Sequence, residues 1–491
     1  MVGAVFLCYD LVMEILIALF LIVFLALSLK RLEFSLYFIS ALLPTYLIRF
    51  QVFGIPLTLL EGMILIAFAV WLFKERLELK KRFKFLFRRF KNRKDRAQKR
   101  IEKSVEKTNY PFWREIILHL IISFGALAVA GFSLSALGIW KAYFFEPVLV
   151  FILAVNILSG EKRYKKLFLA FSLSVLSISL VAIYQKFSGN FISNEFWAAE
   201  ETRRVISWFP YPNAVGLFLA PVLALLLGVF YSLPKFTKLS GALKKIFLAL
   251  IIFLGLLSIF FARSDGGLIG FLVGAFVFFI LASRKKRIFA LSLAGIFIFS
   301  VLIYNPLGEA IGNHLGFKNL SGQIRLQQWE ETLETFKGPA FLLGNGLDGY
   351  QNAVRPYHQE GIFFNYDGLE NFDAVVWASS TLREKYWQPV EIYLYPHNIF
   401  LNFWTELGLF GALLFLFLIF KAMFIAFKLF RYYKKENDHK QFLALGLLAS
   451  FIAIFVHGLV DVPYFKNDLA VMFFLLLTLL GVLKIEANNK N

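Results

Sequence analysis

The sequence has a single cysteine, Cys8, among its 491 residues. One cysteine excludes an internal disulfide bond and any metal site built from several cysteines. A phosphate-binding loop of the Walker type is also absent, so nothing indicates nucleotide hydrolysis. The polar stretches contain no Asp-x-Asp pair and no His/Glu cluster with ligand spacing, which argues against an obligatory metal ion. We therefore expect neither a metal nor another cofactor.

Charged residues are also scarce, at 17% of the chain, whereas 59% of the residues are hydrophobic and 60 are phenylalanine. The mean hydropathy is +0.66. These values are typical of an integral membrane protein and not of a soluble domain. Apolar runs recur that are long enough, at about 17 to 25 residues, to cross a hydrocarbon core as helices. The first run, residues 11–29, is followed by Lys30 and Arg31 and not by a small-residue cleavage site, so we expect a membrane helix there instead of a signal peptide.

The net charge of +19 could indicate a nucleic-acid partner, but the basic residues concentrate in short loops between apolar runs. Residues 74–107 hold 16 Lys/Arg against 5 Asp/Glu and are therefore expected in the cytoplasm. Within them Phe83, Leu86, Phe87 and Phe90 share one helical face, which is typical of a helix on the inner leaflet, although a solvated linker is an equal alternative. Residues 305–396 hold 6 Lys/Arg against 11 Asp/Glu and are expected outside. We expect a lipid bilayer and no nucleic acid as a partner.

The sequence thus predicts an all-α integral membrane protein with 12 or 13 transmembrane helices and one long extracytoplasmic segment. The spans are expected near residues 11–29, 34–50, 57–73, 115–138, 143–159, 167–187, 213–233, 246–262, 267–283, 288–304, 398–427, 441–460 and 468–484. Four parts follow. They are residues 1–114 with the first helices and the basic linker, 115–304 with a central bundle, 305–396 outside the membrane, and 397–491 with the closing helices.

Sparse basic side chains fall near the predicted outer ends of helices: Arg203, Arg204, Arg263, Arg325 and His397. An arginine at such a boundary often only reaches toward the head groups, and this alternative stays open for each one. As a set they lie on the side where few are expected and mostly beside glycine, proline or aromatic residues. Guanidinium groups suit bidentate contacts with phosphate oxygens, so the set predicts a diphosphate ligand.

The long polar segment re-enters a membrane helix at residues 395–411, Tyr-Pro-His-Asn-Ile-Phe-Leu-Asn-Phe-Trp-Thr-Glu-Leu-Gly-Leu-Phe-Gly. Pro396 is expected in the first turn, with His397 directly after it. A histidine at the positive end of a helix dipole can meet an anionic head group on one side and an aqueous acceptor on the other. The alternative is a structural histidine with satisfied hydrogen bonds.

Aromatic residues accompany these charges. Arg325 and Trp329 are spaced i, i+4 and are expected on one face of an external helix. Further aromatic side chains with one polar atom occur in the outer segment, where they suit either sugar faces or the membrane interface. They are Tyr350, Tyr357, Trp377, Tyr386, Trp387, Tyr393 and Tyr395.

Polar residues within the last helices are expected to support the site. Gly408 and Gly411 fall on the His397 face and predict close helix packing beneath it. Glu406 lies deeper and is expected to pair with another helix or a backbone group and not to orient His397. His457 and Asp461 are spaced i, i+4 near the outer end of the penultimate span.

At these residues the chain resembles the superfamily of O-antigen ligases and polymerases, which are bacterial membrane glycosyltransferases. The similarity covers most of the chain from about residue 120 onward. It depends first on His397-Asn398, Leu401, Glu406-Leu407-Gly408 and Gly411, and then on Arg325 with Trp329, Arg263-Ser264 with Gly266-Gly267, and Arg203-Arg204 with Pro212-Asn213.

The resemblance implies a GT-C-like fold and transfer of a glycan from an undecaprenyl diphosphate carrier to an acceptor hydroxyl outside the bacterial cytoplasmic membrane. The reaction would invert the anomeric centre without a metal. His397 would activate the acceptor hydroxyl, and Arg325, Arg203 or Arg204, and Arg263 would bind the diphosphate. Trp329, Asn398, Glu406, His457 and Asp461 are expected to support them.

The acceptor stays open, because it would be selected by the variable outer segment. Transfer to lipid A-core is our first expectation, with repeat-unit polymerisation and protein O-glycosylation as alternatives of the same superfamily. A polysaccharide flippase is the alternative from another class. A flippase would place its charges near the midplane and often shows repeat symmetry, and no clear internal repeat is present.

Overall fold

The computed structural model describes residues 2–52, 54–90, 111–158, 163–233, 239–303, 309, 312–313 and 316–489. For residues 2–11, 77–90 and 239–240 it describes the backbone alone. The described residues are 77% helical, and their sheet is limited to two short two-stranded sheets. Ten helices of these ranges are long and apolar enough to cross a membrane. The predicted all-α integral membrane protein is confirmed, and the chain is a multi-pass protein.

The helices divide into three sets. The first half contains α1 (Val2–Lys30), α2 (Leu32–Ala41), α3 (Leu59–Phe90), α5 (Trp113–Val129), α6 (Leu134–Trp140), α7 (Glu146–Leu158) and α8 (Tyr164–Ser188). The second half contains α10 (Asn213–Ser232), α11 (Leu239–Phe261), α12 (Asp265–Ala282), α13 (Arg284–Ile303), α20 (Ile399–Lys435), α21 (Lys440–Gly458) and α22 (Asn467–Asn488). Shorter helices are α9 (Glu195–Ala198), α15 (Leu320–Glu334), α16 (Ala340–Leu343), α17 (Tyr350–Val354), α18 (Phe372–Ala378) and α19 (Ser380–Tyr386).

The remaining elements are short. They are the 3₁₀ turns η1 (Leu43–Leu47) and η3 (Arg355–Tyr357), the π turn η2 (Lys141–Phe145), and the strands β1 (Arg49–Val52), β2 (Ile55–Thr58), β3 (Gly361–Phe363) and β4 (Trp387–Pro389). Both strand pairs are antiparallel, β1 with β2 and β3 with β4.

The span expected at residues 34–50 is not a continuous helix. Its helix, α2, ends at Ala41, and η1 follows with Pro44 in its first turn. Proline lacks an amide hydrogen, so the chain leaves the α-helix and then forms the β1–β2 hairpin. The next helix, α3, begins with a reciprocal cap in which Thr58 and Glu61 each accept a backbone N–H from the other. It continues to Phe90, but the side chains of Phe83, Leu86, Phe87 and Phe90 lie outside the described residues.

The expected break between residues 138 and 143 was placed wrongly. α5 ends at Val129, and the turn follows at Gly131, whose φ is 65°. The Ser133 side chain then caps α6 by accepting the Ala136 N–H. Helical structure continues through η2 into α7, so residues 134–158 form one span. The wider π turn ends two residues before Pro147, whose ring would meet the carbonyl of a regular preceding turn.

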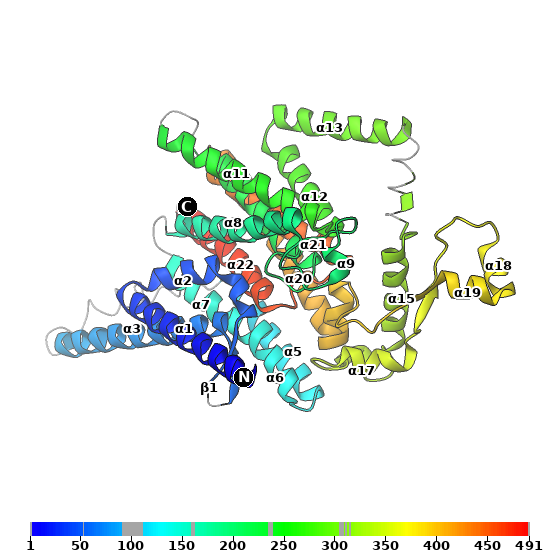
Figure 1. Cartoon of the computed structure of the whole chain (residues 1–491). Coiled ribbons are helices and arrows are strands. Elements are labelled where there is room, and N and C mark those ends of the chain that lie inside the picture. Colours follow the sequence, from blue (N-terminus) through cyan, green and yellow to red (C-terminus); the bar gives the residue numbers. More distant parts are fainter. Residues whose placement is uncertain are drawn as a thin grey trace.

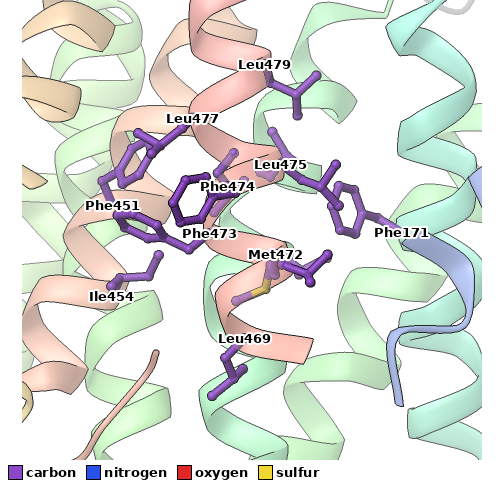
Figure 2. Close-up of a cluster of buried hydrophobic side chains, with 14 of the residues drawn as sticks. Phe171, Phe451, Ile454, Leu469, Met472, Phe473, Phe474, Leu475, Leu477 and Leu479 are labelled. Carbon is purple, nitrogen blue, oxygen red and sulfur yellow. The ribbon is translucent and has the colours of Figure 1, made fainter. Parts of the chain in front are cut away.

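The centre of the bundle is α21, which packs against α10, α12 and α20. Small residues permit these contacts. A Cβ on Gly228 would lie 2.6 Å from the Gly446 Cα, and a Cβ on Gly274 would lie 2.6 Å from the Ala449 carbonyl oxygen. α22 is enclosed as well, and Figure 2 shows its apolar side chains directed toward Phe451 of α21 and Phe171 of α8. A helix that is apolar all round is stable in such a core.

Residues 316–396 form the elements α15 to α19, β3 and β4, which extend from one end of the bundle (Figure 1). At the opposite end lie Arg163, directly before α8, and the turn that follows α20. α13 stands at the edge of the bundle, packs against α12 and exposes most of its apolar surface, as expected of a lipid-facing helix. The division into four parts and the outward orientation of residues 305–396 remain predictions.

The helix at the centre of the sequence analysis differs from the expectation in two ways. α20 begins at Ile399 with Asn398 as its N-cap, so Pro396 and His397 precede the helix. α20 is also interrupted at Gly408, whose φ of 77° and ψ of 178° are not helical. Gly408 therefore does not continue a helical face beneath His397. The physical reason is its contact with α16, because a Cβ on Gly408 would lie 2.1 Å from the Leu342 carbonyl oxygen.

Candidate active site

His397 lies in the turn that leads into α20 and adopts a left-handed backbone conformation, with φ at 45°. Asn398 fixes this turn. Its side-chain oxygen accepts the N–H groups of Phe400 and Leu401 at 3.0 and 3.1 Å, and its Nδ2 donates to the Leu459 carbonyl at 3.1 Å. The left-handed backbone conformation is uncommon for residues other than glycine, and where it occurs it is often at a functional site. The cap and the loop after α21 thus hold His397 in a special geometry.

Asp461 is the acidic neighbour of His397. Its Oδ1 lies 3.6 Å from the His397 Nδ1, which is an ion-pair distance and slightly too long for a hydrogen bond. Asp461 is buried, its Oδ1 accepts its neighbour Val462 N–H at 2.8 Å, and its Oδ2 accepts the Asn213 Nδ2 hydrogen at 3.1 Å. Burial alone would raise the pKa of Asp461, but the adjacent His397 imidazole and the positive charge of Arg325 lower it well below its ordinary value. Asp461 is therefore an anion that faces the imidazole.

Two tyrosine rings set the position of the imidazole. The ring centroids of Tyr393 and Tyr395 lie 5.3 and 5.2 Å from that of His397, both at steep angles. The Tyr395 hydroxyl donates to the Tyr211 hydroxyl at 2.7 Å, and burial raises the pKa of Tyr395 well above its ordinary value. The His397 side chain is nevertheless 18% exposed. It is thus oriented by neighbours and still open to a ligand.

Arg325 and Trp329 lie on α15, and each donates a hydrogen bond to one of the two loops that carry Asp461 and His397. The Arg325 Nε donates to the Val460 carbonyl at 3.0 Å, next to Asp461, and its Nη1 donates to the Ser321 hydroxyl at 2.7 Å. The Trp329 Nε1 donates to the Pro396 carbonyl at 2.9 Å, next to His397. The structure therefore places both residues on the site side of α15, at the two turns that carry Asp461 and His397.

Arg203 and Arg204 point to different places. The Arg204 guanidinium donates to the Asn213 side-chain oxygen at 3.0 Å and to the carbonyls of Ala262 and Arg263 at 3.0 and 3.2 Å. Because Asn213 also binds Asp461, a chain of contacts joins Arg204 to His397. Burial lowers the pKa of Arg204, Asp265 opposes this shift, and the charges of Arg263 and Arg325 add to it. Arg204, Arg263 and Arg325 are thus close enough to interact electrostatically.

Arg203 instead donates to the carbonyls of Ala198 and Lys186, at 3.0 and 3.1 Å. Its side chain lines a pocket of about 500 Å³ together with Lys186, Arg263 and Asp265. Phe260, Phe261 and Leu268 form the apolar part of this pocket. In the described part of the chain the Arg263 guanidinium has no hydrogen-bond partner. The pocket combines three cations with an apolar wall, which suits an anionic amphiphile.

Glu406 and His457 have contacts of their own. The Glu406 Oε2 accepts the Asp348 N–H at 2.7 Å and thereby holds the loop before α17, so it pairs with a backbone group as predicted and does not touch His397. His457 is buried at the end of α21 beside Gly266, where an added Cβ would lie 2.6 Å from the imidazole Cδ2. Asp461 lies beyond the end of α21 and faces His397, so the expected i, i+4 pair with His457 does not form one helical face.

Residues 248–416 match the family described as O-antigen ligase. These residues form an O-antigen ligase domain, which supports the superfamily inferred from the sequence. The match begins in α11 and ends just after the interruption of α20, so it contains Arg263, Arg325 and His397. The resemblance inferred from the sequence is confirmed over these residues, and the domain supports a membrane glycosyltransferase of the ligase and polymerase type. No match was found among curated proteins.

Two further residues belong to the surroundings of the site. Asn213 bridges Arg204 and Asp461, a role that its place in the Pro212-Asn213 motif did not reveal. Lys466 is buried with its Nζ 4.5 Å from the ring centroid of Phe209 and 5.4 Å from that of Tyr211. Burial lowers the pKa of Lys466, while Asp468 and Asp461 oppose the shift. Its only sequence signal was a lysine five residues after Asp461, on the side where few are expected.

Proposed function

We propose that this protein transfers a glycan from undecaprenyl diphosphate to an acceptor hydroxyl at the outer face of the bacterial cytoplasmic membrane, with inversion and without a metal. Lipid A-core is the proposed acceptor. The observation that supports the proposal most is the pair formed by His397 and Asp461, 3.6 Å apart, beside Arg325 and Arg204. The family implies a lipid-linked glycan and an acceptor as substrates in general terms.

The imidazole supplies the base in this proposal. Because the His397 Nδ1 faces Asp461, the Nε2 is the nitrogen left for the substrate. The acceptor oxygen attacks the anomeric carbon, and its proton passes to the Nε2. The bond between the anomeric carbon and the phosphate oxygen breaks, and its electron pair leaves with the lipid diphosphate. Asp461 keeps the imidazole oriented and stabilises the positive charge that forms on it.

The arginines supply charge for the leaving group. A diphosphate that separates from the sugar gains negative charge, which fixed guanidinium groups stabilise without reorganisation. Arg263 and Arg203 line the pocket with the apolar wall, where we place the carrier diphosphate and the start of its isoprenoid chain. Arg325 and Arg204 lie nearer Asp461 and contribute to the field at the reacting end. Between the two adjacent arginines, Arg203 is thus the direct ligand in this proposal, and Arg204 positions Asn213.

Transfer in proteoliposomes tests the proposal. The vesicles contain undecaprenyl-diphosphate oligosaccharide and EDTA, and lipid A-core and a second lipid-linked repeat unit are offered separately. We expect product with lipid A-core from the intact chain and from Arg355→Ala, whose side chain is exposed in the outer segment. Arg325→Ala and Arg263→Ala should lose most of it.

The other outcomes are informative. Product only with the second repeat unit would identify a polymerase and contradict the proposed acceptor. Loss of activity with EDTA and its recovery with a divalent cation would contradict the metal-free reaction. Movement of the lipid across the bilayer without any product would instead indicate a flippase.

A further inference from the structure

Two adjoining pockets lie at the end of the bundle opposite His397. They occupy the space between the start of α5 and the C-terminal halves of α20 and α22, and their volumes are about 280 and 380 Å³. Lys421, Lys484 and Asn488 line both pockets, so the two form one continuous surface. The proposed reaction uses none of these residues.

The charge of this surface is strongly positive. Its cations are Arg114, Lys421, Lys428 and Lys484, and its one acid is Glu115. Glu115 is buried and accepts a hydrogen bond from the Lys421 Nζ at 2.6 Å, so this pair neutralises itself. Three cations remain to attract an anion.

These three cations are available to a ligand. Lys428 lies over the Phe424 ring at 4.4 Å, and Arg114 lies over the Trp113 ring at 5.3 Å. Lys484 is exposed, and among the described residues it has no hydrogen-bond or ion-pair partner. The residues that lead into Pro111 are also basic, with 16 Lys/Arg against 5 Asp/Glu in residues 74–107. The local sequence therefore offers no excess of acids, and an anion has to come from elsewhere.

Apolar side chains complete the surface. Trp113, which lines the smaller pocket, is 47% exposed, and Phe424, which lines the larger one beside Ile425 and Leu429, is 57% exposed. Exposed aromatic and aliphatic groups on a membrane helix face acyl chains, and tryptophan is enriched at the head-group level. A ligand that fits must therefore be anionic at one end and apolar at the other.

We propose that the two pockets bind the phosphodiester head group of an anionic phospholipid from the leaflet on this side, with its acyl chains along Trp113 and Phe424. Because basic loops mark this end of the bundle, the leaflet is the cytoplasmic one under the positive-inside rule. Basic pockets between membrane helices on that side are suited to anionic head groups. The site is independent of glycan transfer.

Thermal unfolding of the purified full chain in a neutral detergent tests the inference. Dihexanoyl phosphatidylglycerol, dihexanoyl phosphatidylcholine and inorganic phosphate are titrated separately. We expect a saturable rise of the midpoint with phosphatidylglycerol alone. Combined Lys428→Gln and Lys484→Gln should raise the half-saturating concentration about 30-fold, because each lysine near an anionic lipid contributes about fivefold. Lys484→Gln alone should raise it about fivefold and keeps the test valid if the double variant does not fold.

The matched control is combined Lys165→Gln and Lys285→Gln. Both lysines are exposed near the same end of the bundle and line neither pocket. The control should bind phosphatidylglycerol as the unchanged chain does. An equal loss in the control would show that surface charge alone attracts the lipid and would overturn the proposed site. Equal stabilisation by phosphatidylcholine or by phosphate, or unchanged binding by the Lys428/Lys484 variant, would also overturn it.

Discussion

Asp461→Asn removes the negative charge that faces His397 while almost preserving the side-chain shape. The Asp461 Oδ1 and the His397 Nδ1 lie 3.6 Å apart. At an effective dielectric constant of about 20, unit charges at such a distance attract each other by about 4 kcal/mol. If His397 takes the acceptor proton, the variant loses up to this amount of electrostatic stabilisation of the transition state. A factor of ten in rate corresponds to about 1.4 kcal/mol. We therefore expect turnover to fall about 10³-fold, within the usual range for general base catalysis.

The assay is steady-state glycan transfer in proteoliposomes, with kcat and KM determined for both substrates. KM for the lipid donor should change little, because Asp461 is not a proposed diphosphate ligand. Asp367→Asn is the control, because Asp367 is an outer-segment acid whose partners Lys385 and Tyr386 lie on α19. It should leave turnover unchanged.

A double-mutant cycle separates a shared role from simple damage. If His397 and Asp461 act together, His397→Ala combined with Asp461→Asn should lose hardly more activity than His397→Ala alone. Additive losses, or a fall in the thermal midpoint of Asp461→Asn that accounts for the lost activity, would refute the reasoning.

Three other predictions concern the supports of the site. Gly408→Ala should destabilise the protein by about 2 kcal/mol or more, because alanine is strained at a φ of 77° and its Cβ would meet α16, whereas Gly241→Ala, with open space around it, should not lower the thermal midpoint. Lys466→Met should remove a pH dependence. Because burial lowers the native pKa of Lys466, the unfolded chain holds the proton more tightly, so the free energy of unfolding should rise as pH increases toward 10.5 in the unchanged chain and less so in the variant. Trp329→Phe should lower turnover about tenfold by releasing the turn before His397, whereas Trp404→Phe, which removes a similar indole hydrogen bond, should lower stability but not turnover; kinetic and unfolding measurements on both variants check this.

The fold was predictable where length and hydropathy decide it. The spans corresponding to α8, α10, α12 and α22 were placed within a few residues, because each is an apolar run bounded by polar or turn residues. The interruption of α20 was not predictable, because the apolar pattern continues on both sides of Gly408. Contact with α16, about 65 residues earlier in the chain, determines that backbone.

Which residues form the candidate site was predictable from the sequence, whereas which of them contact one another was not. His397, Arg325 and Trp329 stood out because of residue type and boundary position. The neighbour of His397 is Asp461, which lies in a different loop, and no local spacing could bring the two together. Similarly, adjacent loop residues such as Arg203 and Arg204 can point in opposite directions, and only the tertiary contacts with Lys186 and Asn213 show which way each one turns.

The most direct test of the proposed function is the initial rate of glycan transfer by His397→Ala, compared with the intact chain and with His439→Ala. His439 is exposed at the opposite end of the bundle and provides a matched histidine. A loss of at least about 10²-fold in His397→Ala, with an unchanged thermal midpoint and full activity in His439→Ala, is the predicted result. Transfer by His397→Ala at the rate of the intact chain would contradict the assignment of His397 as the base.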